Sequence, residues 1–206
     1  MAGALFKKDI EAETGVSWEN WIALLKEDCG RAATNDEIEA YLQEVQKVND
    51  TWIPIIAAMY GQLLGRKPVG QTAAVGFNIG VRRTVPVPRE RLWDFLVSPE
   101  GMKLWIGDVA PFLLQVGSRF ASREGTSGKL GVVKLHEKLR MSWQRHDWDS
   151  PSTLQIYLLP AAAGKTTISF HQEKLDDLYM REMMRRHWDE VIIRILAQTN
   201  TKEDLR

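Results

Sequence analysis

Apolar positions follow two different periods along the chain, and the change falls near residue 70. Before it, apolar residues recur every three or four positions, which is typical of helices with one buried face. Three such stripes predict short helices near residues 18–28, 35–45 and 49–64. Thr34 and Glu37 form a capping-box pattern at the start of the second helix. The sequence therefore predicts a small three-helix region at the N-terminus.

After residue 76 apolar and polar residues alternate, which is typical of strands with one buried face. The expected strands are 77–85, 112–116, 118–123, 129–135, 139–145, 153–159 and 166–171. Pro88 and Ser98 begin two short helices after the first strand, and Gly125-Thr126-Ser127-Gly128-Lys129 is interpreted as a hairpin turn rather than a phosphate loop. A long helix with a wide apolar face is expected over 176–198.

This order of elements predicts an α+β fold in which the last helix covers one face of an antiparallel meander. The expected domains are a helical region over 1–66, a linker over 67–76 and a sheet-and-helix domain over 77–206. Whether the helical region packs on the second domain is left open at this stage.

Several short motifs occur in a fixed order along the second domain. They are Val87-Pro88-Arg89-Glu90-Arg91-Leu92-Trp93, Ser98-Pro99-Glu100, Leu104-Trp105, Val116-Gly117-Ser118-Arg119-Phe120, Leu139-x-x-x-Trp143, Leu154-x-Ile156-x-Leu158-x-Pro160, Gly164-Lys165-Thr166 and His187-Trp188-Asp189. Together they resemble the helix-grip superfamily (SRPBCC), which includes START-like lipid-transfer domains, and within it the branch named for activators of the heat-shock-protein-90 ATPase. The resemblance implies a helix-grip fold, a curved antiparallel sheet of about six or seven strands around the C-terminal helix. Residues 14–65 resemble a small helical domain of unknown function.

Composition and charge exclude several classes of protein. Of 206 residues, 44% are hydrophobic and 26% are charged, as in ordinary globular proteins. Lys and Arg total 27 and Asp and Glu also total 27, so nothing indicates a nucleic-acid partner. No apolar run is long enough for a membrane span. The single cysteine, Cys29, favours a reducing compartment, so a cytoplasmic location is expected.

No motif for catalysis or for a cofactor is found. The four histidines lack metal-ligand spacing, and there is no G-x-S-x-G elbow or G-x-G-x-x-G loop. We therefore expect no metal and no cofactor. Some members of the superfamily are enzymes, but the sequence favours a non-catalytic protein. Arg181, Arg185 and Arg186 are interpreted as a solvated helix face, with docking of an acidic partner as the alternative.

Eight tryptophans direct attention to an aromatic interior between the sheet and the last helix. The candidate cavity residues are Phe95, Trp105, Phe120, Met141, Trp143, Ile156, Leu158, Phe170, Met184, Trp188 and Ile192. Polar residues that could join them are Arg119, Gln144, Arg145, Tyr157 and His171.

Two functions compete at this stage. The first is non-catalytic binding of a small hydrophobic or amphipathic molecule in that cavity, with affinity from buried apolar area. The alternative is a protein-interaction module, similar to a co-chaperone that activates the heat-shock-protein-90 ATPase, with a filled core. The expected partner is thus a small molecule or a protein, and the oligomeric state is left open.

Overall fold

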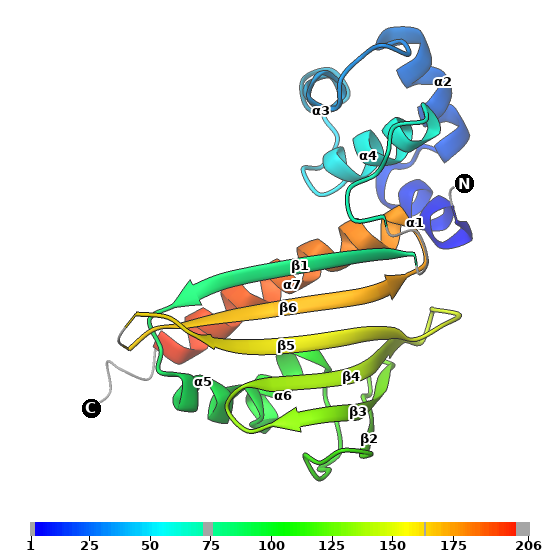
Figure 1. Cartoon of the computed structure of the whole chain (residues 1–206). Coiled ribbons are helices and arrows are strands. Elements are labelled where there is room, and N and C mark those ends of the chain that lie inside the picture. Colours follow the sequence, from blue (N-terminus) through cyan, green and yellow to red (C-terminus); the bar gives the residue numbers. More distant parts are fainter. Residues whose placement is uncertain (1–2, 72–75, 163, 201–206) are drawn as a thin grey trace. The chain divides into compact units, whose positions relative to one another are not determined.

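The computed structural model describes residues 3–71, 76–162 and 164–200, which fall into two compact units (Figure 1). Unit 1 comprises Met1–Phe77 with Asp176–Met183, and unit 2 comprises Asn78–Leu175 with Met184–Arg206. Part of the expected linker, residues 72–75, lies outside the described residues. That residues 77–206 form an independent domain stays a prediction.

Unit 1 contains four helices rather than the expected three. They are α1 (Ala4–Thr14), α2 (Trp18–Asp28), α3 (Asn35–Glu44) and α4 (Ile53–Leu63). The sequence analysis missed α1 because its stripe is only two residues long, Phe6 and Ile10, both fully buried. The Phe6 ring meets Trp18 edge-on at 5.0 Å, and Trp52 stacks on Tyr179 at 5.9 Å.

The predicted capping box of α3 is confirmed. The Thr34 hydroxyl accepts from the Glu37 amide at 3.3 Å, and the Glu37 carboxylate accepts from the Thr34 amide at 2.7 Å. Helix α4 begins at Ile53 rather than near residue 49, with Pro54 in its first turn, where a missing N–H leaves no intrahelical bond unmade.

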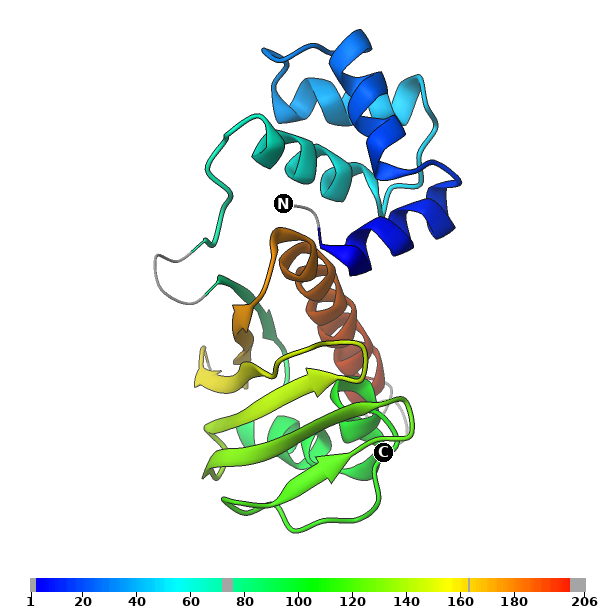
Figure 2. The same ribbon diagram turned by 90° about the vertical axis from the view of Figure 1, so that its right-hand side faces the viewer.

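Unit 2 has the helix-grip architecture that the family resemblance implied. Its strands are β1 (Phe77–Val85), β2 (Arg119–Ala121), β3 (Thr126–Lys134), β4 (Lys138–Arg145), β5 (Ser152–Pro160) and β6 (Thr166–Leu175). They form one six-stranded sheet in the order β1-β6-β5-β4-β3-β2. The long helix α7 (Leu178–Asn200) runs along one face of this sheet (Figures 1 and 2).

Helices α5 (Arg89–Leu96) and α6 (Pro99–Trp105) follow β1. The Ser98 hydroxyl accepts from the Gly101 amide at 3.1 Å, which confirms Ser98 as the cap of α6. A Cβ at Gly101 would lie 1.9 Å from the carbonyl oxygen of Phe95. Glycine therefore permits the close approach of α6 to the end of α5.

Two expectations for the sheet are wrong. Residues 112–116 form no strand; Leu113 and Val116 are exposed, so the segment has no buried face to hold it in a register. The turn before β3 lies at Arg123–Gly125, where Gly125 has a φ of 89°, and Thr126 already belongs to β3.

The strand register sorts the sheet into two faces. The inner face, which α7 covers, contains the pairs Leu139↔Ile156, Met141↔Leu154, Ile156↔Phe170 and Leu154↔Gln172. The outer face contains the pairs Arg140↔Gln155, Gln155↔His171, Lys138↔Tyr157 and Ser142↔Thr153. Directly opposed residues share a face, so these pairs fix the orientation of whole strands.

Candidate functional site

Three aromatic rings from three elements meet on the inner face. Trp188 of α7 stacks on Phe170 of β6, with ring centroids 4.7 Å apart and planes at 12°. Trp143 of β4 meets Trp188 edge-on at 5.6 Å. Such offset-stacked and edge-to-face contacts are the preferred geometries of aromatic pairs. The structure thus brings together three of the residues that the sequence analysis assigned to the cavity.

A chain of buried hydrogen bonds lies beside these rings. Trp188 Nε1 donates to Gln172 Oε1 at 2.7 Å, and Gln172 Nε2 donates to Ser152 Oγ at 2.8 Å. Ser152 Oγ donates in turn to the carbonyl oxygen of Trp143 at 2.7 Å. Gln172 and Ser152 are at most 1% exposed, so these bonds meet the polar demands of groups that water does not reach.

The short helices are tied to the same cluster. Trp105 Nε1 donates to the carbonyl oxygen of Leu96 at 3.0 Å, and Trp143 Nε1 donates to the carbonyl oxygen of Trp105 at 3.2 Å. The remaining apolar candidates on the sheet and α7 are at most 2% exposed: Met141, Ile156, Leu158, Met184 and Ile192.

Two predicted cavity residues lie outside the cluster of Trp143, Phe170 and Trp188. Phe120 is buried against Phe112 and borders an open hollow of about 500 Å³ beside β2, β3 and β4. Phe95 is half-buried and borders a separate hollow of about 250 Å³, together with Arg91 and Thr199. Neither hollow is lined by Trp143, Phe170 or Trp188.

Four of the five polar candidates lie on the opposite face from the cavity. The register places Arg119, Gln144, Tyr157 and His171 on the outer face, because their pairing partners are outer-face residues. The expectation that they could point into the space under α7 is therefore wrong for these four. Arg145 has the parity of Trp143 but is held by Asp147, with nitrogen–oxygen distances of 3.0 and 2.8 Å.

Sequence reasoning missed two residues that complete the cluster, Trp148 and His187. Both rings lie against Trp143, with centroid distances of 5.4 Å for Trp148 and 6.3 Å for His187. In the described part of unit 2, Trp148 Nε1 and His187 Nε2 are the buried side-chain polar atoms without a hydrogen-bond partner. Buried polar atoms nearly always have a hydrogen-bond partner. Two such atoms without a partner beside the Trp143 ring therefore indicate a candidate binding site.

His187 is held neutral. Burial is the main reason that the pKa of its imidazole falls from 6.5 to about 4, and the nearby Arg145 guanidinium lowers this pKa further. Glu190 opposes the shift and Arg194 adds to it. A neutral imidazole has one N–H donor and one acceptor nitrogen. With the proton assigned to Nδ1, His187 Nε2 is an acceptor.

The turn between β4 and β5 holds Trp148 in place. Gln144 Nε2 donates to the Trp148 carbonyl oxygen at 2.7 Å, and the Trp148 amide donates to the carbonyl oxygen of Arg145 at 3.1 Å. Trp148 is only 5% exposed although it lies in a polar turn, between Asp147 and Asp149. A tryptophan among turn residues was the available signal in the sequence, since turns rarely need a large apolar side chain.

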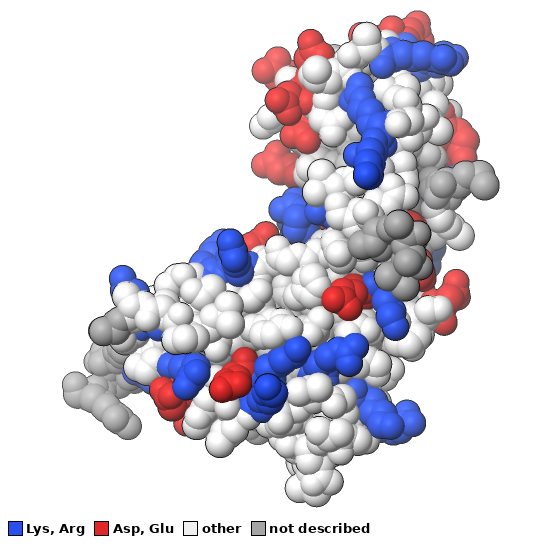
Figure 3. All heavy atoms as spheres, in the orientation of Figure 1, with Lys and Arg blue, Asp and Glu red and all other residues white. Residues whose placement is uncertain are grey.

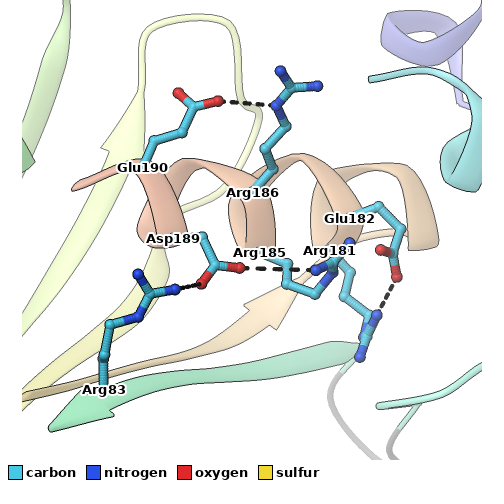
Figure 4. Close-up of polar contacts among 7 residues, drawn as sticks. All are labelled: Arg83, Arg181, Glu182, Arg185, Arg186, Asp189 and Glu190. Atoms are coloured by element: carbon cyan, nitrogen blue, oxygen red, sulfur yellow. Dashed lines mark hydrogen bonds and ion pairs between the residues drawn. The ribbon is translucent and has the colours of Figure 1, made fainter. Parts of the chain in front are cut away.

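The basic cluster on α7 is paired within its own helix (Figure 4). Arg186 Nε lies 2.9 Å from Glu190, and Arg185 lies 3.8 Å from Asp189, which also approaches Arg83 at 3.7 Å. Arg181 pairs with Glu182, and its side chain is only 12% exposed. Carboxylates therefore accompany all three arginines, which does not favour this cluster as a docking surface.

Two negative findings apply to the described residues. Among residues 3–71, 76–162 and 164–200, no group of three His, Cys, Asp or Glu side chains is placed to hold a metal ion. Within the same ranges, no helix has the length and apolar character needed to cross a membrane.

The curved sheet, the gripped C-terminal helix and the two short helices after β1 define a START-like protein of the helix-grip class. Residues 86–200 match the family described as Activator of Hsp90 ATPase homolog 1-like protein. The chain belongs to this family.

Solved structures share the fold at low sequence identity. DynU16, from the dynemicin biosynthetic locus, aligns over 61% of this chain and 48% of its own with 15% identity and a TM-score of 0.55, so this chain matches about half of it. CalU16 from Micromonospora echinospora aligns over 66% of this chain and 84% of its own, with 18% identity and a TM-score of 0.53. MLL2253 from Mesorhizobium loti aligns over 61% of this chain and 97% of its own, with 21% identity and a TM-score of 0.50. No curated protein matches in sequence.

Proposed function

We propose that the protein binds a small hydrophobic molecule that carries a hydroxyl or a similar donor–acceptor group, and that this polar group meets Trp148 and His187 beside Trp143. The observation that carries this proposal is the pair of buried polar atoms without partners, Trp148 Nε1 and His187 Nε2. Around them, the polar atoms of Gln172, Ser152 and the Trp188 indole are already paired.

The chemistry of the two atoms selects the ligand. An indole N–H can only donate, and His187 Nε2 accepts when the imidazole proton is on Nδ1. A hydroxyl can accept from the first and donate to the second at the same time. A cationic group fits poorly, because Trp148 offers a donor and Arg145 adds positive charge near His187. The surrounding aromatic rings favour an apolar body.

A matched pair of probes tests this assignment. 2-Naphthol and naphthalene have the same apolar body, and only the first has a hydroxyl. We expect 2-naphthol to bind at least about tenfold more tightly, because each hydrogen bond to an otherwise unpaired buried group contributes about 1 kcal/mol or more. Quenching of tryptophan fluorescence measures both affinities. Equal affinities, or no binding of either probe, would contradict the proposal.

Variants of the two orphaned groups sharpen the test. Trp148→Phe and His187→Leu should each remove most of the preference for 2-naphthol, whereas His146→Leu, an exposed histidine in the same turn, should leave it unchanged. Trp148→Phe removes an indole N–H that has no partner in the protein. It should therefore change stability less than a truncation that breaks a bond would. Native mass spectrometry of protein from its own host would detect a retained molecule directly.

The second candidate is a co-chaperone-like interaction module with a filled core, favoured by the direct contact of Phe170, Trp188 and Trp143. The substitution Met184→Trp separates the two functions. If unfilled space adjoins Met184, the added ring occupies it, stability holds and probe binding is lost. In a filled core the same substitution forces strained side chains and destabilises the protein by about 1–3 kcal/mol.

A further inference from the structure

The outer face of the sheet carries a set of basic side chains that the linear sequence does not reveal. Six basic residues and one acidic residue, Glu173, have outer-face positions in the six strands. The basic residues are Arg82, Arg119, Lys129, Lys134, Lys138 and Arg140. Figure 3 views this face and shows Lys and Arg side chains spread over the strands, with few Asp and Glu among them.

These six residues have no carboxylate partners in the part of the chain that the structure describes. Glu173, the acidic residue of this face, is engaged by His171 at 2.9 Å and by Gln155 at 3.3 Å. Lys138 lies over the Tyr157 ring, 4.5 Å from its centroid. This differs from Arg181, Arg185 and Arg186 of α7, where each guanidinium has an acidic neighbour. The outer face therefore keeps its positive charge.

Two pairs of like charges are directly opposed across this face. Lys134 pairs with Lys138 at the β3–β4 turn, and Arg119 pairs with Lys129 between β2 and β3. Like charges at directly opposed positions destabilise a sheet. Sites that break a local rule of this kind are often functional, because a partner supplies the missing compensation. An anionic partner would do so at both pairs.

The chemistry of the face distinguishes between anionic partners. Binding of single-stranded nucleic acid uses exposed aromatic rings as stacking platforms, whereas Tyr157 is the aromatic residue at the described outer-face positions and Lys138 already covers it. Stable anchoring to a bilayer surface combines basic charge with apolar side chains that insert, and this face has few such side chains. Its positions are polar or charged apart from Gly80, Ala121, Val132 and Leu159. Carboxylates on a protein segment need neither feature.

The spacing of the charges suits an extended chain. Lys138 and Arg140 are two residues apart on β4, and alternate residues of a strand are about 7 Å apart. Alternate carboxylates of an extended segment have the same repeat. The hollow of about 500 Å³, lined by Arg119, Ser127, Ser142 and Gln144 among others, adds a recess at one end of the face.

We propose that the outer face of the sheet is a docking surface for an acidic protein segment in extended conformation, held by Arg119, Lys129, Lys134, Lys138 and Arg140. This surface lies on the other side of the sheet from Trp143, so the proposal does not depend on the small-molecule function. Binding is electrostatic, so it should weaken as salt rises.

A fluorescein-labelled peptide of five Glu-Ser repeats is the probe, with five Gln-Ser repeats as the neutral control, measured by fluorescence anisotropy on the full-length protein. We expect saturable binding of the acidic peptide at about 20 mM NaCl, at least tenfold weaker at about 300 mM, and at least tenfold weaker binding of the neutral peptide. The charge-reversed variant Lys134→Glu/Arg140→Glu should bind the acidic peptide at least tenfold more weakly. The matched variant Lys103→Glu/Arg194→Glu, exposed but off this face, should change binding less than twofold.

A swapped probe keeps the test informative. The Lys134→Glu/Arg140→Glu variant should bind a peptide of five Lys-Ser repeats more tightly than the parent protein does, which a misfolded variant would not. Three results would overturn the proposal: no binding of the acidic peptide, equal losses in the two double variants, or tighter binding of oligouridylate or phosphatidylserine vesicles than of the acidic peptide. The last would assign the face to a nucleic acid or a membrane.

Discussion

The two faces of the sheet follow opposite rules although they share the same strands. On the inner face Trp188, Gln172, Ser152 and the Trp143 carbonyl form one hydrogen-bonded chain, and the aromatic rings are in direct contact. On the outer face the basic side chains have no carboxylate partners among the described residues, and two like-charged pairs are directly opposed. The hydrogen-bonded chain of the inner face maintains the fold, whereas the outer face keeps charge available. A disturbance of that chain should cost stability, and a disturbance of the outer face should cost binding of the acidic segment.

The largest effect is expected at Trp188, which is fully buried between sheet and helix. Trp188→Ala removes the stack on Phe170 and the bond to Gln172, and it should destabilise the protein by about 3–5 kcal/mol. Urea unfolding measures this loss. Tyr157→Ala on the outer face is the matched control and should cost under about 1 kcal/mol. A loss at Trp188 as small as that of the control would show that the inner face is not the core.

The second effect is a pH dependence caused by His187. Its pKa is about 4 in the folded protein and 6.5 when unfolded, so the unfolded chain binds more protons between these values. Stability should therefore fall as the pH drops from 6.5 towards 4, by about 2–3 kcal/mol. Urea unfolding at a series of pH values measures it.

His187→Gln should flatten this part of the profile, and His146→Gln, an exposed histidine, should not. A profile that stays unchanged in His187→Gln would assign the acid sensitivity to other groups.

The third comparison uses one substitution on both faces. Gln172→Leu leaves the Trp188 indole and the Ser152 hydroxyl without their partner in a buried place, at a cost of about 1–3 kcal/mol. Gln155→Leu on the outer face removes the partner of the half-buried Tyr157 hydroxyl and of the Glu173 carboxylate. The Glu173 side chain is 37% exposed, so water can take the place of Gln155 there. This substitution should cost clearly less in thermal unfolding. A larger loss at Gln155 would reverse the roles of the two faces.

The smallest effect has the opposite sign. Lys134→Gln relieves the opposition of Lys134 and Lys138, and it should raise the free energy of unfolding by a few tenths of a kcal/mol. The gain should shrink at high salt, because exposed charges are screened there. If Lys134→Gln destabilises the protein, Lys134 has a structural partner and the outer face is not free.

The sequence predicts the inner face well because period and burial agree there. The expected alternation places Leu139, Met141 and Trp143 on one face, as the structure does. The apolar stripe of α7 lies against this same face. Trp148 and His187 escaped prediction for a physical reason. Their role depends on which buried nitrogens lack a partner, and this is a property of tertiary contacts rather than of periodicity.

The cluster of basic residues on the outer face could not be predicted from the sequence, because β3 contains a β-bulge. Lys129 and Lys134 are five residues apart, so strict alternation assigns them to opposite faces. The register of β3 shifts between Leu130 and Val132, and this extra residue brings both lysines to the outer face. No pattern of apolar and polar residues announces such a shift.

The hydrogen-bonded chain under α7 also has a direction. An indole N–H can only donate and a backbone carbonyl can only accept, and the chain has one of these at each end, Trp188 and Trp143. The two groups between them could each point either way in isolation. Here the two ends allow only one arrangement of donors and acceptors: the Gln172 side-chain oxygen points towards the helix, and the Ser152 hydroxyl proton points towards β4. The chain therefore has one orientation of its dipoles, because reversing the bond between Gln172 and Ser152 would take away the bond at each end of the chain.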